Sequence, residues 1–184
     1  MSAGTLKIDA LKLRGRVRAV LEDNIDTDII YPGRYLNITD REKTAEHLFE
    51  LAYPEIRPAL AAGEFIVAGR NFGCGSSREQ AAAALKFAGV GAVIAVSFAR
   101  IFFRNAINLG LPAIVSAEAA QACAAGDELE LDLVTGQIRN LTRCLAIASA
   151  PLDPRAAELL AAGGLIPYLK QKRHVMDRTP VISS

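Results

Sequence analysis

The sequence predicts an α/β fold with a mostly parallel central sheet, flanking helices and an antiparallel hairpin. Between residues 65 and 115, short continuous apolar runs alternate with helical patterns. Such strand–helix–strand units need crossover connections, which favour a parallel arrangement of the strands. Residues 128–133 instead alternate charged and apolar side chains without exception, which is typical of an antiparallel strand with one solvated face.

The first strand is expected over residues 14–21, where charged and apolar side chains alternate. The acidic segment 23–28 is too rich in turn-forming residues to extend this strand. A helix should begin after Thr39, because Thr39 and Glu42 have the spacing of a capping box. Residues 65–68 then predict a short buried strand.

The next helix is expected over residues 77–88, which contain four consecutive alanines and are followed by Gly89 as a C-terminal cap. The apolar run 92–96 predicts the second strand of the parallel set. Ser97 is placed to cap a further helix over 98–107.

The remaining elements complete a single domain. They are a third parallel strand at 113–115, a hairpin of 128–133 and 137–143 around Thr135 and Gly136, and helices at about 153–162 and 165–172. We expect one domain over residues 1–184, with its core at about 14–172, a loose N-terminal arm and a disordered tail from Asp177.

Composition and charge exclude several classes of function. The chain has 184 residues, 51% of them hydrophobic, and 21 Lys and Arg against 20 Asp and Glu. This near-neutral balance gives no basic footprint for nucleic acid, and the basic residues 170–174 fit a solvated helix end. The longest uncharged apolar stretch, Phe87–Ala99, is too short for a membrane span, and the N-terminus lacks a signal-peptide pattern. We therefore expect a cytoplasmic protein.

The cysteines and histidines do not form a metal site by spacing. Cys74, Cys123 and Cys144 are far apart and form no C-x-x-C pair, and His47 and His174 are the only histidines. Neither a disulfide framework nor a self-contained zinc or iron–sulfur site fits this set. We expect no metal or cofactor on this chain.

The glycine-rich segment 69–80 carries the most specific chemistry. Its glycines allow a tight turn, and the helix behind it directs unpaired N–H groups toward a ligand, which predicts an anion site. Arg78 in the first helical turn opposes the helix dipole, so a bound carboxylate or phosphate explains it better. Ser76 and Ser77 also fit capping boxes, with Glu79 and Gln80, so spacing alone leaves their role open.

Longer motifs carry a family resemblance. The chain contains NFGCGSSRE, preceded by DNIDTDIIYPGRYL and followed by AVIAVSFARIFFRNAINLGLP. Together they closely resemble the small subunits of 3-isopropylmalate dehydratase, in the aconitase superfamily, over about residues 14–172. The PGRYLN motif resembles the archaeal-type branch, which also includes small subunits of homoaconitase and 2,3-dimethylmalate dehydratase.

The resemblance implies a swivelling β/β/α domain that closes over a separate large subunit carrying a [4Fe-4S] cluster. It implies a lyase, active only with that partner, that isomerises 2-isopropylmalate to 3-isopropylmalate by dehydration and rehydration in leucine biosynthesis. The cluster would act as a Lewis acid on the substrate hydroxyl.

The resemblance also assigns site residues. Ser76 corresponds to the general base of the superfamily, and Ser77 and Arg78 to groups that hold a substrate carboxylate. Asp28 matches an aspartate that organises the site, although a turn-forming role is the alternative.

A second segment, which contains Tyr35, Asn37 and Ile38, resembles the part of the family that recognises the substrate. Because Asn37 and Ile38 carry no charge, they favour a substrate with an apolar branch. Further candidates that could reach the site are Arg34, Arg100, Arg104 and Asn105.

Alternatives remain open at this stage. The first alternative function is that of another hydroxy-acid dehydratase of the same family. The second is a non-catalytic anion-binding module, which is suggested by Gln80 at a position where the family usually has His. A nucleotide-dependent oxidoreductase is disfavoured, because no complete dinucleotide fingerprint follows any strand.

Overall fold

A computed structural model describes residues 11–176, and seven strands of this part form one sheet in the order β4-β3-β2-β1-β5-β6-β7. The strands are β1 (Lys12–Leu21), β2 (Phe65–Ala68), β3 (Ala92–Ala95), β4 (Ala113–Val115), β5 (Glu128–Asp132), β6 (Gln137–Asn140) and β7 (Leu145–Ala148). Strands β1 to β4 are parallel, and β5 to β7 are antiparallel. The predicted α/β class is confirmed, and β7 extends the predicted hairpin by a strand.

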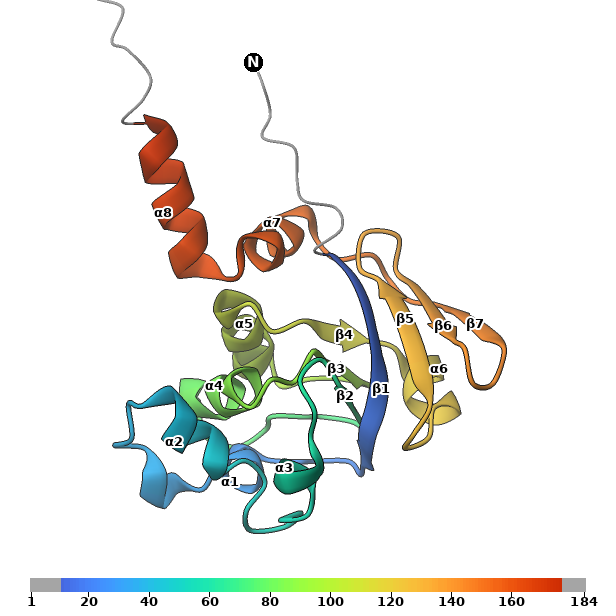
Figure 1. Cartoon of the computed structure of the whole chain (residues 1–184), viewed down its shortest axis with the longest axis horizontal. Coiled ribbons are helices and arrows are strands. Elements are labelled where there is room, and N and C mark those ends of the chain that lie inside the picture. Colours follow the sequence, from blue (N-terminus) through green and yellow to red (C-terminus); the bar gives the residue numbers. More distant parts are fainter. Residues whose placement is uncertain (1–10, 177–184) are drawn as a thin grey trace, which may run out of the picture.

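The helices cover the sheet unevenly. They are α1 (Thr27–Ile30), the 3-10 helix η2 (Gly33–Tyr35), α2 (Arg41–Glu46), α3 (Ile56–Ala59), α4 (Glu79–Phe87), α5 (Arg100–Leu109), α6 (Ala117–Ala122), α7 (Pro154–Ala162) and α8 (Leu165–Met176). Helices α1 to α5 lie on one side of the parallel strands, whereas α8 projects from the body (Figure 1). Most of the predicted N-terminal arm and the predicted tail lie outside the described residues.

Strand β1 joins the two halves of the sheet. Its first half pairs antiparallel with β5, and its second half pairs parallel with β2. The register with β2 shifts between Val17 and Ala19, so Arg18 is an extra residue in β1, as in a β-bulge. The Arg18 guanidinium donates two hydrogen bonds of 2.7 Å to the buried carboxylate of Glu64, which lies just before β2. This ion pair therefore holds the junction of the two halves.

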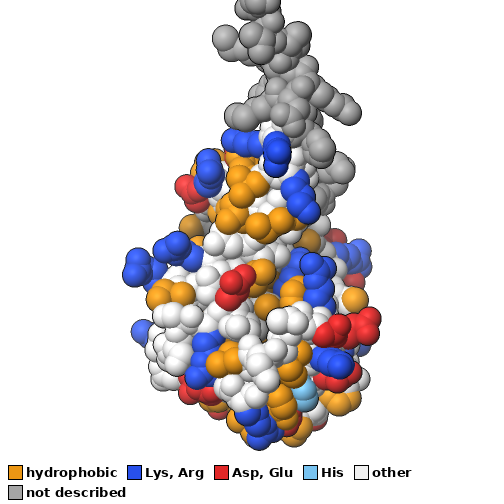
Figure 2. Space-filling view, turned by 90° about the vertical axis from the view of Figure 1, so that its left-hand side faces the viewer, with side chains coloured by type: hydrophobic (Ala, Val, Ile, Leu, Met, Phe, Trp, Pro, Cys, Tyr) orange, Lys and Arg blue, Asp and Glu red, His pale blue; other side chains and the backbone are white. Residues whose placement is uncertain are grey.

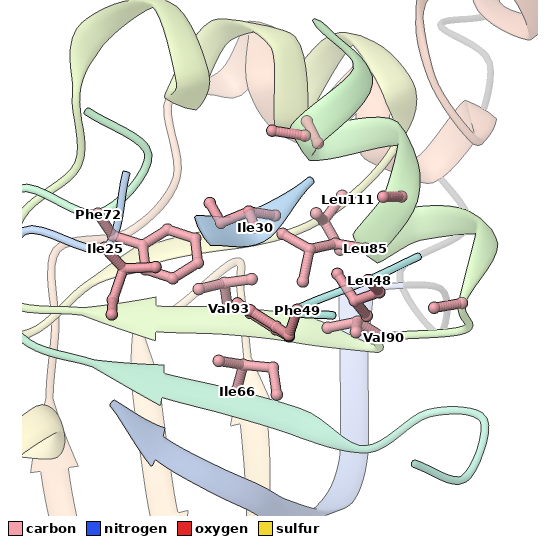
Figure 3. Packing of buried hydrophobic residues seen from close by; sticks show 14 of the residues in the cluster. Ile25, Ile30, Leu48, Phe49, Ile66, Phe72, Leu85, Val90, Val93 and Leu111 are labelled. Atoms are coloured by element: carbon pink, nitrogen blue, oxygen red, sulfur yellow. The ribbon is translucent and has the colours of Figure 1, made fainter. Parts of the chain in front are cut away.

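The parallel strands are buried on both faces, which explains their continuous apolar runs. In β2, Ile66 and Ala68 face the core beneath α1 to α5, whereas Phe65 and Val67 face a second core enclosed by β5, β6, α6 and α7. Figure 3 shows the first core, where Leu85 of α4 approaches side chains of β2 and β3. A strand that packs on two faces has no solvated side to encode by alternation.

The predicted cap of α2 is wrong. Asp40, and not Thr39, caps α2, because its carboxylate accepts a hydrogen bond of 2.9 Å from the Lys43 N–H. The helix ends at Glu46, and the chain turns at Phe49, whose φ of 58° lies in the left-handed region. Thr39 and Asp40 are neighbours, and both residue types commonly cap helices, so the local sequence pattern did not show which of them caps α2.

The projecting helix α8 exposes apolar side chains. Ile166 and Leu169 are 62% and 50% exposed. Figure 2 shows apolar side chains at the upper part of the molecule, flanked by Lys and Arg side chains. Within residues 11–176, no helix has both the length and the apolar character needed to cross a bilayer.

Replacing Glu64 tests the junction. The side-chain hydrogen bonds from Arg18 lower the pKa of Glu64 from its ordinary value of 4.5 despite burial. The ion pair therefore stabilises fully above about pH 4.5, and this stabilisation is lost as the pH falls through the lower folded-state pKa. We expect Glu64→Gln to lower the free energy of unfolding by about 2 kcal/mol at pH 7, as for hydrogen bonds to a charged group.

Urea denaturation of both proteins at pH 7 and at successively lower pH measures this effect. The difference between wild type and Glu64→Gln should shrink below pH 4.5. A difference that stays constant with pH would contradict an ionic contribution from Glu64.

Candidate active site

The predicted site residues lie where β2 ends and the chain turns toward α4. Ser76, Ser77 and Arg78 line a hollow of about 170 Å³ together with Thr27 and Arg100. The carboxyl edge of parallel strands is the usual position for a ligand site in α/β proteins. The structure thus brings together the three residues of the glycine-rich segment that the sequence singled out.

Backbone hydrogen bonds hold this segment from one side. The Gly73 N–H donates to the Ile25 carbonyl over 2.7 Å, and the Thr27 N–H donates to the Cys74 carbonyl over 2.9 Å. The Thr27 hydroxyl also donates to the carbonyl of Ser76 over 3.2 Å. These bonds continue the β1–β2 pairing past the ends of both strands. The position of Ser76 therefore follows from main-chain bonds just before it and from the Thr27 hydroxyl.

The segment before α5, residues 97–99, holds the glycine-rich loop from the other side. The Phe72 N–H donates to the Ser97 carbonyl over 3.0 Å, and the Ala99 N–H donates to the Phe72 carbonyl over 2.9 Å. Ser97 does not cap α5 as predicted, because the helix begins at Arg100 with Ala99 at its N-cap. Instead, the Ser97 hydroxyl accepts a hydrogen bond of 2.8 Å from the Asn71 N–H. Ser97 therefore bonds to the glycine-rich loop and does not cap the start of α5.

The glycines of the loop have different roles. Gly73 has a φ of +76°, and a Cβ added there would lie 2.2 Å from the ring of Phe102. Gly75 has a φ of +87°, but a Cβ there would meet no atom closer than 3.5 Å. Gly73 is therefore required both for its backbone angle and for close packing, whereas Gly75 is required for its backbone angle alone.

Ser76 and Ser77 do not form the predicted capping boxes. Helix α4 begins at Glu79, and Arg78 occupies its N-cap position without a side-chain bond to the helix. Both serines are exposed, and within the described part of the chain no hydrogen bond engages either hydroxyl. The hydroxyls are thus available to a ligand near the start of α4, where an anion is favoured.

An ion pair links the two predicted motifs. Arg78 donates to Asp28 Oδ1, and the same oxygen accepts a hydrogen bond of 3.0 Å from the Gly33 N–H. Asp28 is half exposed, whereas Arg78 is 23% exposed. The neighbouring Asp26 has a purely local role, since it caps α1 by accepting from the Ile29 N–H over 2.8 Å.

Tyr35, Asn37 and Ile38 do not line the hollow. The ring of Tyr35 stacks on His47 with centroids 3.6 Å apart, and its hydroxyl bonds to Glu50. Asn37 is exposed and Ile38 is half-buried. Their contact with a substrate stays a prediction.

The four further candidates differ in their surroundings. Arg100 lines the hollow, which Arg104 and Asn105 do not. Arg34 pairs with Glu50. The sequence offered no signal that would separate Arg100 from the other arginines, because its position depends on where α5 begins.

The described residues do not fit an iron–sulfur cluster. Among them, no three His, Cys, Asp or Glu side chains gather as metal ligands. Burial raises the pKa of both the Cys74 and the Cys123 thiols, which opposes the thiolate form that cluster binding needs. Cys144 is exposed and has no cysteine partner in the described part.

Known proteins share this sequence and fold. Residues 61–119, which contain the loop and α4, match the model of the aconitase C-terminal domain. The 3-isopropylmalate dehydratase small subunit of Moorella thermoacetica is 55% identical over 82% of this chain and 90% of that protein. The chain belongs to the 3-isopropylmalate dehydratase small-subunit family. A crystal structure of 3-isopropylmalate dehydratase from Methanocaldococcus jannaschii has a TM-score of 0.83 at 41% identity, covering 91% of this chain and 98% of that one.

A small subunit named for a different reaction is similarly close in sequence. A methanogen homoaconitase small subunit from Methanothermobacter thermautotrophicus is 52% identical over 86% of this chain and 91% of that protein. Overall sequence identity therefore does not distinguish a 3-isopropylmalate dehydratase subunit from a homoaconitase subunit.

Paired glycine variants test the packing of the loop. We expect Gly75→Ala to cost about 1–2 kcal/mol in unfolding free energy, because alanine is strained at positive φ. Gly73→Ala should cost about 1–3 kcal/mol more, because its Cβ also overlaps Phe102. Urea denaturation measures both values, and equal losses would show that Phe102 does not restrict position 73.

Proposed function

We propose that this chain is the small subunit of a two-subunit hydro-lyase that isomerises 2-isopropylmalate to 3-isopropylmalate by removing water and adding it back. The main support is the hollow at the start of α4, where the unengaged hydroxyls of Ser76 and Ser77 lie with Arg78. These groups suit a carboxylate beside a carbon that loses a proton. Membership of the 3-isopropylmalate dehydratase small-subunit family supports the same reaction.

A large subunit completes the site in this proposal. The hollow of about 170 Å³ is smaller than the several hundred Å³ of ordinary ligand pockets, which supports a second subunit that encloses the substrate. The partner would carry the [4Fe-4S] cluster, which supplies Lewis acidity toward the substrate hydroxyl when bound. Such a heteromer would work in the cytoplasm, in leucine biosynthesis.

Ser76 is the proposed general base. It would take the proton from the carbon next to a substrate carboxylate, and return a proton during rehydration. A serine hydroxyl is a very weak acid in water, so its alkoxide needs nearby positive charge. The N–H groups at the start of α4 and the guanidinium of Arg78 supply it.

Arg78 and Ser77 are the proposed carboxylate clamp. Among the contacts within the described chain, Asp28 engages only Nη1 of Arg78, so other guanidinium donors remain for a ligand. A planar guanidinium can hold a carboxylate through two parallel hydrogen bonds. Asp28 orients Arg78, and the Ser77 hydroxyl adds a donor at the same edge of the hollow.

Replacing Ser76 tests the base. In the complex reconstituted anaerobically with its cluster-loaded large subunit, we expect Ser76→Ala to reduce kcat by about 10²–10⁴-fold, the usual contribution of a general base. Ser149→Ala, the same change beside the antiparallel strands, should keep full activity. Size-exclusion chromatography should show that both variants still assemble, and full activity of Ser76→Ala would remove Ser76 from this role.

The second candidate function is the same type of reaction on a related substrate. It is supported by a homoaconitase small subunit that is as similar to this chain as most of the dehydratase small subunits are. Homocitrate-type substrates carry an additional carboxylate, and the loop at Asn37 and Ile38 offers no cation for it. We therefore favour a substrate with an apolar branch, with 2,3-dimethylmalate as the nearest competitor.

A substrate panel separates these candidates. Steady-state kinetics of the reconstituted complex should give the highest kcat/KM for isopropylmalate, a lower value for dimethylmalate and the lowest for homocitrate. Preference for homocitrate would replace the proposed substrate. Binding of dicarboxylates without turnover of any of them would instead favour a non-catalytic anion-binding module.

A further inference from the structure

Glu50 collects three polar side chains around one carboxylate. It accepts hydrogen bonds from the Arg34 guanidinium and from the Tyr35 hydroxyl, the latter over 3.0 Å. The His47 Nδ1 lies 2.6 Å from its other oxygen. Arg34 and Tyr35 belong to η2, whereas His47 and Glu50 follow α2, so this carboxylate ties two segments together.

Aromatic contacts reinforce the same cluster. The rings of Tyr35 and His47 are stacked, with 9° between their planes, and the Arg34 guanidinium lies 4.8 Å from the centre of the Tyr35 ring. The Tyr31 hydroxyl donates to the Tyr35 carbonyl over 2.9 Å. Tyr35 is thus held through its ring, its hydroxyl and its main chain, which leaves it little freedom to turn toward a substrate.

The backbone before Glu50 is strained. Phe49 has a φ of 58°, which is unusual for a bulky residue, and its side chain is fully buried. Its N–H donates to the Ile30 carbonyl over 2.9 Å, and its ring packs edge-on against Tyr53. This turn allows the Phe49 ring to enter the core while the next residue reaches η2. A strained conformation persists where the surrounding contacts fix it, and such positions often serve a site.

The segment that Glu50 holds begins at the candidate active site. Gly33 bonds to Asp28, and a Cβ added to Gly33 would lie 3.0 Å from Nη1 of Arg78. The main chain then turns through η2 to Ile38, whose N–H donates to the Tyr35 carbonyl over 2.9 Å. The segment 33–38 is therefore anchored by Asp28 at its start and by Glu50 through Arg34 and Tyr35.

The charge of Glu50 is well suited to this position. Burial alone would raise the pKa of Glu50, but hydrogen bonds from His47, Tyr35 and Arg34 hold that pKa below its ordinary value. Glu50 is therefore ionised at neutral pH and neutralises Arg34. Among the described residues, Glu50 bonds to Arg34 through Nη2 alone, so it offsets the charge of this more than half-exposed guanidinium and leaves its other donors free, as Asp28 does for Arg78. A guanidinium whose charge is offset attracts an additional substrate carboxylate less strongly than an isolated one.

We propose that Glu50 is a positioning residue that fixes the segment 33–38 and offsets the charge of Arg34, so that this segment selects a substrate with an uncharged branch. The selection depends on the proposed dehydratase function, whereas the anchoring of the segment does not. The residue acts through Arg34 and Tyr35 and does not itself touch the substrate.

Amide hydrogen exchange of the isolated full chain tests the anchoring. We expect Glu50→Gln to accelerate exchange in segment 33–38 about ten-fold, the effect of losing one hydrogen bond to a charged group, while β2 and β3 stay unchanged. Glu46→Gln, which removes the same charge from an exposed position on α2, should leave exchange at its wild-type rate. Tyr35→Phe removes a single bond to Glu50 and should give a smaller acceleration in the same segment, including when Glu50→Gln does not fold. Unchanged exchange in both Glu50→Gln and Tyr35→Phe overturns the proposal.

Kinetics of the reconstituted complex test the selection. We expect Glu50→Gln to raise KM for isopropylmalate about ten-fold with kcat largely kept, and to raise the ratio of kcat/KM for homocitrate over that for isopropylmalate. A loss shared equally by both substrates, or confined to kcat, indicates a structural role and overturns the selection. If the wild-type complex turns over neither substrate, the proposed function fails, and the exchange experiment still decides whether Glu50 anchors the segment.

Discussion

The candidate site depends on main-chain pairing that continues beyond the ends of the parallel strands. Gly73 bonds to Ile25 on one side, and Phe72 bonds to Ser97 on the other. Because carbonyl and N–H groups hold the loop from both sides, Ser76 and Ser77 are not needed for its shape. Their hydroxyls are left for a ligand. The shape of the loop depends instead on Gly73, because Phe102 leaves no space for a side chain at that position.

The small side chains of α4 bring its N-terminus to this loop. Ala81, Ala82 and Ala84 are fully buried, so the helix lies close to the sheet and to its neighbours. Alanine also has the highest helix propensity, which supports a helix of only nine residues. The alanine-rich composition thus contributes to the site by bringing the start of α4 to the loop that carries Ser76 and Ser77.

In the proposed function, the chain supplies part of an active site that a large subunit completes. It contributes serine hydroxyls, a guanidinium oriented by Asp28 and a shallow hollow, while its described residues gather no metal ligands. Two carboxylates hold the surroundings of this site: Asp28 joins Arg78 to the start of η2, and Glu50 joins η2 to the segment after α2. These internal bonds fix the segment around η2 and the start of α4 within the chain itself.

The sequence by itself determined the α/β class, the parallel strands and the position of the glycine-rich loop, because apolar runs and glycines encode these features locally. It also singled out Ser76, Ser77 and Arg78 as site candidates, because their motif is contiguous. The contacts of Ser97 and Glu50 were decided only by the tertiary structure. Ser97 looks like a helix cap in sequence but bonds to Asn71, and Glu50 has no local signal at all. The contacts of both residues depend on partners that folding brings together. A hydrogen bond between segments that are distant in the sequence produces no periodic pattern of residue types that could predict it.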